Sequence, residues 1–303
     1  MSSSEIKNVT IIGAGGNLGP TILKTLLEES SFNVTVLSRE GSSSTFPEGV
    51  KVVRANYQDT NSLTSALKGA DAVLSFVGST ALGDQNKLID AAIAAGVKRF
   101  LPSEYGSDVT NEKLAALVPI FAPKIATIDY LKSKESEISW SSIITGGFFD
   151  WGIKVTFFGF NSQTKTATLI DGGNSKFVAT NLRQIGRSII KTLEKADETK
   201  NKYIYVSSFV TSQQEILAAA EKVTGEKWTV NNVVGQELLE AGNAKLAKLD
   251  FSGVGDLLRA TAFGNFGVAD FSAKLWNDKL GLPKEDFEES VKTSLSGKLV
   301  GEQ

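Results

Sequence analysis

The sequence predicts an α/β fold: a Rossmann, doubly wound parallel sheet combined with a smaller, less regular C-terminal substrate domain. Short β-branched runs alternate with stretches of helical period over residues 1–146. The runs are apolar throughout, which is typical of parallel strands covered on both faces. A glycine-rich turn follows the first run, and the alternation ends at Gly146–Gly147.

Each predicted strand is short, apolar or β-branched, and bounded by Gly, Ser, Pro or Asp. These strands are Val9–Ile12, Val34–Leu37, Val50–Arg54, Ala72–Phe76, Arg99–Leu101, Ser141–Ile144 and, later, Tyr203–Val206. The helical patterns between the first six are Leu18–Glu29, Ser62–Leu67, Gln85–Ala95 and Lys124–Glu137. A strand-helix-strand order of this kind predicts a parallel sheet covered on both faces.

The second half of the chain is less regular. Ser212–Val223 has helical period, whereas the Gly- and Phe-rich stretch Asp250–Phe271 suits a mobile flap more than a long regular helix. We therefore expect residues 1–150 plus about 181–210 to form the Rossmann domain. About 151–180 plus 211–303 are then the substrate domain.

Composition excludes several kinds of chemistry. The 303 residues include no His and no Cys, so thiolate nucleophiles, Cys/His zinc sites, Ser-His-Asp triads and disulfides are excluded, and we expect no metal site. The 32 Lys and Arg against 34 Asp and Glu leave no basic excess, so nucleic acid is not an expected partner. Acid-base catalysis would therefore depend on other side chains or on a cofactor.

The chain shows no membrane or export signal. The first residues lack the charged and apolar regions of a signal peptide, and no apolar run is long enough to cross a bilayer. We expect a cytoplasmic protein that binds a small-molecule substrate and no membrane. The sequence leaves the oligomeric state open.

A glycine loop follows the first predicted strand and opens the first helix. The segment 13–19 reads GAGGNLG, a G-x-x-G-x-x-G pattern. Gly13 would turn the chain, Gly16 would let the backbone approach a pyrophosphate, and Gly19 would permit close helix-strand contact. Asn17 and Leu18 lie inside the loop and are expected to contact the same ligand. At this position the pattern favours dinucleotide binding over an ordinary turn.

The end of the second strand indicates which dinucleotide binds. An acidic residue about twenty residues beyond the loop usually binds the ribose of NAD, but here Ser38 and Arg39 occupy this place. A guanidinium can pair with a 2′-phosphate, so NADPH is favoured over NADH, and FAD is less favoured. The alternatives are that Glu40 binds the ribose, or that Arg39 and Glu40 are solvated turn charges.

Two later strand ends carry further cofactor candidates. Asn56 follows the third strand, and Phe76 and Gly78 stand at the end of the fourth. Ligands of open α/β sheets bind at the carboxyl ends of the strands. We therefore expect Asn56 to hydrogen-bond adenine, and Phe76 and Gly78 to line its ribose.

Six aromatic residues occur within residues 148–160. They are Phe148, Phe149, Trp151, Phe157, Phe158 and Phe160. Such a cluster is either an apolar wall for a planar ligand or hydrophobic core, and the sequence leaves both interpretations open.

Lys124 directly follows Pro123, which suits the first turn of a helix. A cation there opposes the helix dipole, so no local interaction favours it. Lys124 shares a stripe with Ile128 and Leu131, which directs it inward rather than toward water. The alternative is an ordinary solvated surface lysine.

The segment 97–106, VKRFLPSEYG, resembles the V-K-R-F-x-P-S-E-[FY]-G segment of the isoflavone reductase-like, NmrA-like family of atypical short-chain dehydrogenases/reductases. With the glycine loop before it and Lys124 after it, the resemblance covers about half the chain. It implies a Rossmann domain that binds NADPH, with a substrate cleft over the nicotinamide. Plant members of this family reduce phenylpropanoid, lignan and isoflavonoid substrates.

The resemblance also implies roles for individual residues. Lys124 matches the family's catalytic lysine and is expected to contact the cofactor as well. The loop Gly13–Gly19 with Arg39 matches the family's cofactor-binding residues. Ser103, Glu104 and Tyr105 would close the fifth strand beside the active site, with Ser103 and Tyr105 binding substrate. Further residues that match the family would either line the nicotinamide and substrate site or stand at the start of a helix. These are Gly147, Phe148 and Phe149 for the wall, and Gln85 for the helix.

Two departures from the wider family bear on mechanism. The tyrosine of the Tyr-x-x-x-Lys pair would fall at Ile120, so that mechanism and nucleotide-sugar epimerase chemistry are disfavoured. The histidine that some plant reductases use near the substrate is absent. We expect an NADPH-dependent reductase that transfers hydride to a small planar, aromatic or conjugated substrate, with Lys124 as proton donor or oxyanion partner. The alternative is a non-enzymatic NADP(H)-binding regulator or redox sensor.

Overall fold

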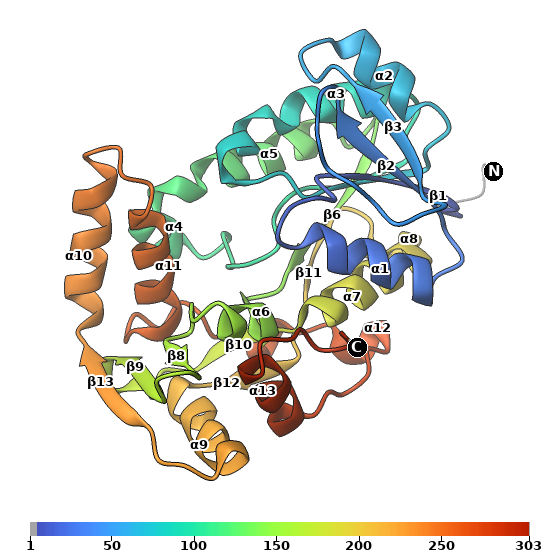
Figure 1. Ribbon diagram of the computed structural model, residues 1–303. Coiled ribbons are helices and arrows are strands. Elements are labelled where there is room, and N and C mark those ends of the chain that lie inside the picture. The colour runs from blue at the N-terminus through green and yellow to red at the C-terminus, as the bar shows by residue number, and fades with distance from the viewer. Residues whose placement is uncertain (1–4, 303) are drawn as a thin grey trace.

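The computed structural model describes residues 5–302, apart from the side chains of residues 79 and 80 (Figure 1). The first four residues, which belong to the segment that lacks a signal pattern, lie outside this range. Within the described range no helix is both long and apolar enough to cross a membrane.

A seven-stranded sheet forms the centre of the molecule, and all its strand pairs are parallel. Its strand order is β11-β6-β5-β4-β1-β2-β3. The strands are β1 (Asn8–Ile12), β2 (Asn33–Arg39), β3 (Lys51–Ala55), β4 (Ala72–Ser75), β5 (Arg99–Leu101), β6 (Ser139–Ile144) and β11 (Lys202–Tyr205). The predicted fold class and all seven predicted strands of this sheet are confirmed.

Helices cover both faces of this sheet, as Figure 1 shows. One face is covered by α1 (Gly19–Glu29) and α7 (Leu182–Glu194), and the other by α2 (Thr60–Leu67), α3 (Gln85–Ala94) and α5 (Ala122–Ser133). Neighbouring strand residues face opposite cores: Ile11 packs with the first helix pair and Ile12 with the second group. Since both faces are buried, the strands need no polar alternation.

The remaining strands form two small sheets beyond the end of β6. One has the order β12-β10-β7 and the other β13-β9-β8. The strands are β7 (Gly147–Phe148), β8 (Phe160–Asn161), β9 (Thr166–Ile170), β10 (Phe177–Thr180), β12 (Phe209–Thr211) and β13 (Thr229–Val233). Their core is rich in phenylalanine.

The other helices complete this region and its connections. The longer ones are α9 (Gln213–Thr224), α10 (Gly235–Leu246), α11 (Gly253–Phe263) and α13 (Phe287–Leu295), and the shorter ones are α4 (Glu112–Leu117), α6 (Phe149–Lys154), α8 (Ala196–Thr199) and α12 (Asn277–Leu280). In Figure 1, α10 and α11 stand side by side as the orange arm of the molecule.

Helix α11 corrects the interpretation of 250–271 as an irregular flap. Leu257, Ala260 and Phe263 recur at helical spacing and are buried. The glycine that suggested irregularity instead permits close helix packing: a Cβ on Gly253 would lie 2.4 Å from the carbonyl oxygen of Gly242 in α10. Gly253 thus reflects contact between two helices rather than loop structure.

Candidate functional site

The backbone of the glycine loop between β1 and α1 lies in close contact with the backbone of Phe76 and, within the loop, of Ala14. Gly13 has a φ of +84°, and a Cβ there would lie 2.4 Å from the carbonyl oxygen of Phe76. A Cβ on Gly19 would lie 2.5 Å from the backbone of Ala14. No side chain of the described residues caps the N-terminus of α1. The loop therefore leaves helix-end amides available to an anion.

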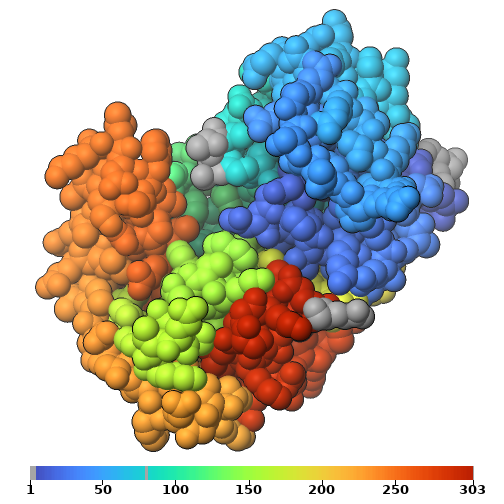
Figure 2. Space-filling model, viewed as in Figure 1, coloured from blue at the N-terminus to red at the C-terminus, as the bar shows by residue number. Residues whose placement is uncertain are grey.

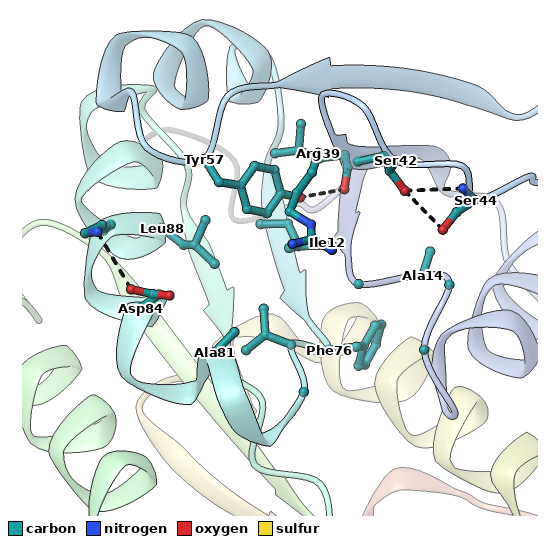
Figure 3. A pocket seen from close by; sticks show the side chains of 18 of the residues that line it. Ile12, Ala14, Arg39, Ser42, Ser44, Tyr57, Phe76, Ala81, Asp84 and Leu88 are labelled. Carbon is teal, nitrogen blue, oxygen red and sulfur yellow. Dashed lines mark hydrogen bonds and ion pairs between the residues drawn. The ribbon is translucent and has the colours of Figure 1, made fainter.

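A groove of about 400 Å³ runs from this loop across the carboxyl ends of β2 and β4. Figure 3 shows Arg39 and Tyr57 near one another, across the groove from Ala14 and Phe76. Most of the cofactor-binding residues predicted from the sequence line it. These are Gly13, Gly16, Ser38, Arg39, Phe76 and Gly78.

Arg39 reaches the far end of the groove from the end of β2, whereas Glu40 does not line it. Arg54 on β3 supports this end, because its guanidinium donates to the backbone oxygens of Ser42 at 2.9 Å and of Arg39 at 3.3 Å. The lining of the groove therefore includes the exposed guanidinium of Arg39 and the hydroxyls of Ser42 and Ser44. This arrangement suits a phosphate monoester.

Asn56 is not among the residues that line the groove. Its side-chain oxygen accepts a hydrogen bond from the backbone N–H of Gln58 at 2.9 Å, which forms a local turn. Tyr57 and Gln58 line the groove instead. The Tyr57 hydroxyl donates to the carbonyl oxygen of Leu37 at 2.9 Å, and burial raises the pKa of Tyr57 to about 12. It therefore stays neutral at physiological pH.

Leu18 and Gly19 also lie outside the groove lining. Leu18 is buried in the core beneath the loop, and Gly19 begins α1. Both residues shape the loop rather than contact the groove. Asn17, from the same loop, lines a second cavity instead.

This second cavity is a cleft of about 410 Å³ between the sheet's carboxyl edge and the C-terminal region. Figure 2 shows the surface hollowed between the orange arm of α10 and α11 and the blue N-terminal part. The walls of the cleft are predominantly aromatic and aliphatic. Its aromatic lining consists of Tyr105, Phe121, Phe148, Trp151, Phe157, Phe158, Phe177, Phe263 and Phe271.

The aromatic cluster of residues 148–160 divides between cleft and core. Phe148, Trp151, Phe157 and Phe158 line the cleft, together with Gly147. Phe149 is fully buried and packs on Phe158, Phe209 and Phe287. Phe160 is also buried in this core. The structure therefore places Phe149 in the core behind the cleft and not on its wall.

Lys124 enters the cleft from the first turn of α5. Its Nζ donates a hydrogen bond to the backbone carbonyl oxygen of Glu104 at 2.6 Å and lies 5.8 Å from the ring centre of Phe121. Ile128 and Leu131, on the same stripe of α5, are buried, as predicted. Burial lowers the pKa of Lys124, and the nearby charge of Glu104 acts in the opposite direction.

Ser103 lies behind the cleft and does not line it. Its backbone N–H donates to Oε1 of the buried Gln85 at 2.8 Å, and its Oγ donates to the carbonyl oxygen of Val77 at 2.8 Å. Ser103 and Gln85 thus fix the segment after β5 to the start of α3. Tyr105, two residues further along the same segment, does line the cleft.

Groove and cleft adjoin where Phe76 meets Tyr105. Phe76 lines the groove, Tyr105 lines the cleft, and their ring centres are 5.0 Å apart. Asn17 of the glycine loop reaches the cleft from the same side. An extended ligand that begins at Arg39 and crosses the loop would therefore end near Lys124.

Several residues that line the cleft come from parts of the chain that sequence reasoning did not assign to a site. Leu258, Thr261 and Phe263 come from α11, and Phe271 follows it. Asp108 also lines the cleft, where its carboxylate binds Lys274 at 2.8 Å. Helical spacing of the apolar residues in 253–263 was the signal that could have found the first group.

The glycine loop, the groove at the switch of strand order and the adjoining cleft define a Rossmann-fold protein of the dinucleotide-binding type. The chain belongs to the NmrA-like family, whose profile matches residues 5–264. The family resemblance seen in the sequence is thereby confirmed.

Individual relatives agree with this assignment. Oxidoreductase aprR of Aspergillus flavus is 33% identical over 295 residues, or 95% of this chain and 99% of that protein. Isoflavone reductase homolog P3 of Arabidopsis thaliana is 30% identical over 79% of this chain and 82% of that protein. The leucoanthocyanidin reductase–NADPH complex from Vitis vinifera superposes with a TM-score of 0.78 at 22% identity, covering 95% of this chain and 99% of that one.

Proposed function

We propose that this protein is an NADPH-dependent reductase that transfers hydride to a small planar, aromatic or conjugated substrate. One observation carries the proposal: the side-chain Nζ of Lys124 is held on the wall of an aromatic cleft that adjoins a dinucleotide-type groove. Related proteins bearing the names oxidoreductase and isoflavone reductase homolog support it. In this proposal residues 1–150 and about 181–210 hold the cofactor, and the remainder forms the substrate side.

The groove fits NADPH chemically. Because a Cβ on Gly13 would collide with the Phe76 carbonyl oxygen, glycine at this position lets the loop lie against the end of β4, and the uncapped amides of the loop and α1 would bind the pyrophosphate. Arg39 would pair with the 2′-phosphate, and Ser42 and Ser44 offer hydroxyl donors beside it. When bound, NADPH supplies the hydride from C4 of its nicotinamide.

The cleft favours a flat and largely uncharged substrate. Phe148, Trp151 and Phe263 present apolar faces, which would orient a planar ring and exclude water. The acidic Asp108 and the basic Lys124 both line the cleft. Asp108 is already paired with Lys274. Lys124 remains as the charged donor to a substrate oxygen.

Lys124 would act where negative charge develops. As an ammonium it retains donors beyond the one given to the Glu104 carbonyl, because Nζ carries three hydrogens. It would hydrogen-bond or protonate the substrate oxygen as hydride reaches the adjacent conjugated carbon. The chain needs no histidine for this step.

The test is to incubate purified protein with NADPH and a panel of enones and phenolic quinone methides while following nicotinamide absorbance. We expect NADPH oxidation that depends on substrate and is lost in Lys124→Ala. NADPH binding without oxidation across the panel, in wild type as in the variant, would instead support the non-enzymatic regulator or redox sensor.

A further inference from the structure

The carboxyl group of Glu104 is buried, and no contact of its side chain in the described part of the chain gives it a structural role. The residue is 0% exposed, and neither carboxylate oxygen has a hydrogen-bond partner among the described residues. Such a group is costly to bury, since an unpaired carboxylate loses its hydration without replacement. A purely structural role would have been filled better by an apolar side chain or a paired one.

The surroundings of Glu104 connect it to Lys124. The backbone carbonyl oxygen of Glu104 accepts a hydrogen bond from Nζ of Lys124 at 2.6 Å. This contact holds the end of the Lys124 side chain at the residue that carries the buried carboxyl. Lys124 on α5 and Tyr203 on β11 are the titratable groups that interact electrostatically with the Glu104 carboxyl. Asp108, which also lines the cleft, is paired with Lys274 and accepts from the hydroxyls of Thr110 and Tyr205.

We propose that Glu104 is a positioning residue whose buried carboxylate keeps Lys124 in its ammonium form within the apolar cleft. The backbone carbonyl of Glu104 fixes the position of the Lys124 Nζ. The Glu104 carboxylate supplies the negative charge that acts on it. The electrostatic interaction between Glu104 and Lys124 does not depend on any reaction that the protein catalyses. Its consequence for turnover rests on the proposed function.

The titration behaviour of both groups agrees with this geometry. Burial raises the pKa of Glu104 to about 7, while the charge of Lys124 opposes that rise. Burial lowers the pKa of Lys124, while the charge of Glu104 opposes that fall. Each group therefore favours the charged form of the other.

The first experiment measures the free energy of unfolding of wild type and Glu104→Gln against pH. The carboxyl ionises near 4.5 when unfolded and near 7 when folded, so the folded state binds more protons in this window. The Glu104 carboxyl then contributes a loss of wild-type stability as pH rises from 4.5 to about 7. Glu104→Gln lacks this loss, so its stability relative to wild type should rise through the window and then level off.

The same comparison in a Lys124→Met background tests the coupling itself. Without the Lys124 charge, folded Glu104 ionises less readily, so the rise should extend to higher pH before it levels off, and its midpoint should increase. An identical midpoint in both backgrounds, or a difference between wild type and Glu104→Gln that does not vary with pH, would overturn the proposal. Neither measurement needs a substrate, so both remain decisive if the reductase proposal fails.

Turnover supplies the second readout. With a substrate from the panel, the alkaline limb of the kcat profile should move to lower pH in Glu104→Gln, because the ammonium is then less stable. NADPH affinity should stay unchanged. Asp129→Asn is the matched control: it removes an exposed carboxylate of α5, which pairs with Lys132, and should leave the profile in place. An unmoved limb in Glu104→Gln would contradict the role in turnover.

Discussion

The Nζ of Lys124 donates a hydrogen bond to the backbone carbonyl oxygen of Glu104 at 2.6 Å. This bond joins the first turn of α5 to the segment after β5, two elements at the same edge of the sheet. Because the acceptor is backbone, it stays available whichever protonation state the Glu104 side chain adopts. The Lys124 Nζ is thus held at the cleft wall before any ligand arrives, as a preorganised donor requires.

Lys124→Ala should abolish turnover while leaving NADPH affinity largely intact. The change removes the donor in the cleft but no residue that lines the groove. Steady-state kinetics and fluorescence titration with NADPH measure the two effects. The control Lys132→Ala, an exposed lysine of the same helix, should alter neither. Retained turnover in Lys124→Ala would remove the lysine from the mechanism.

Arg39→Ala should weaken NADPH binding about tenfold or more while changing NADH binding little. A hydrogen bond to a charged group contributes about 1.5–3 kcal/mol, and only NADPH carries the 2′-phosphate. Isothermal titration with each cofactor gives the ratio. Lys51→Ala removes an exposed cation of the adjacent strand β3 and serves as control. Equal losses for both cofactors would show that Arg39 does not contact the phosphate.

Gly13→Ala should lower stability and cofactor affinity together, and more than Gly69→Ala does. Both glycines have a φ of +84°, so both substitutions carry the left-handed backbone cost of about 1 kcal/mol. At Gly69 the added Cβ meets open space, whereas at Gly13 it meets the Phe76 carbonyl at 2.4 Å. Thermal denaturation and NADPH titration of the pair separate backbone conformation from close approach. Equal effects of the two changes would argue against a tight cradle.

Phe148→Ala and Phe149→Ala should separate substrate binding from folding. Phe149 is fully buried, so its truncation should cost about 3–5 kcal/mol of unfolding free energy. Phe148 is only partly buried and lines the cleft, so its truncation should mainly raise KM. Urea denaturation and substrate kinetics provide the readouts. The reverse pattern would mean that the wall of the cleft has been assigned to the wrong ring.

The parallel sheet could be predicted because its information is local. Apolar β-branched runs such as Val34–Leu37 identify buried strands, and the position of Gly13 between strand and helix identifies the ligand edge. The inward direction of Lys124 followed from helical spacing with Ile128. Each of these inferences used residues close together in sequence.

The rest of the site depends on tertiary contacts that no local pattern records. Phe148 and Phe149 are identical residues next to each other in the sequence, yet Phe148 lines the cleft and Phe149 is buried in the core. At the end of β3 the sequence favoured Asn56, whereas Tyr57 turns into the groove. Gly253 suggested a loop because the partner that requires it, Gly242, belongs to another helix.

A crystal structure of the protein with NADPH bound tests the central claim most directly. We predict the 2′-phosphate at Arg39, the pyrophosphate on Gly13–Gly16, and the nicotinamide past Phe76 and Tyr105 in the cleft beside Lys124. A nicotinamide placed outside that cleft, or a cofactor without contact to Arg39, would contradict the account.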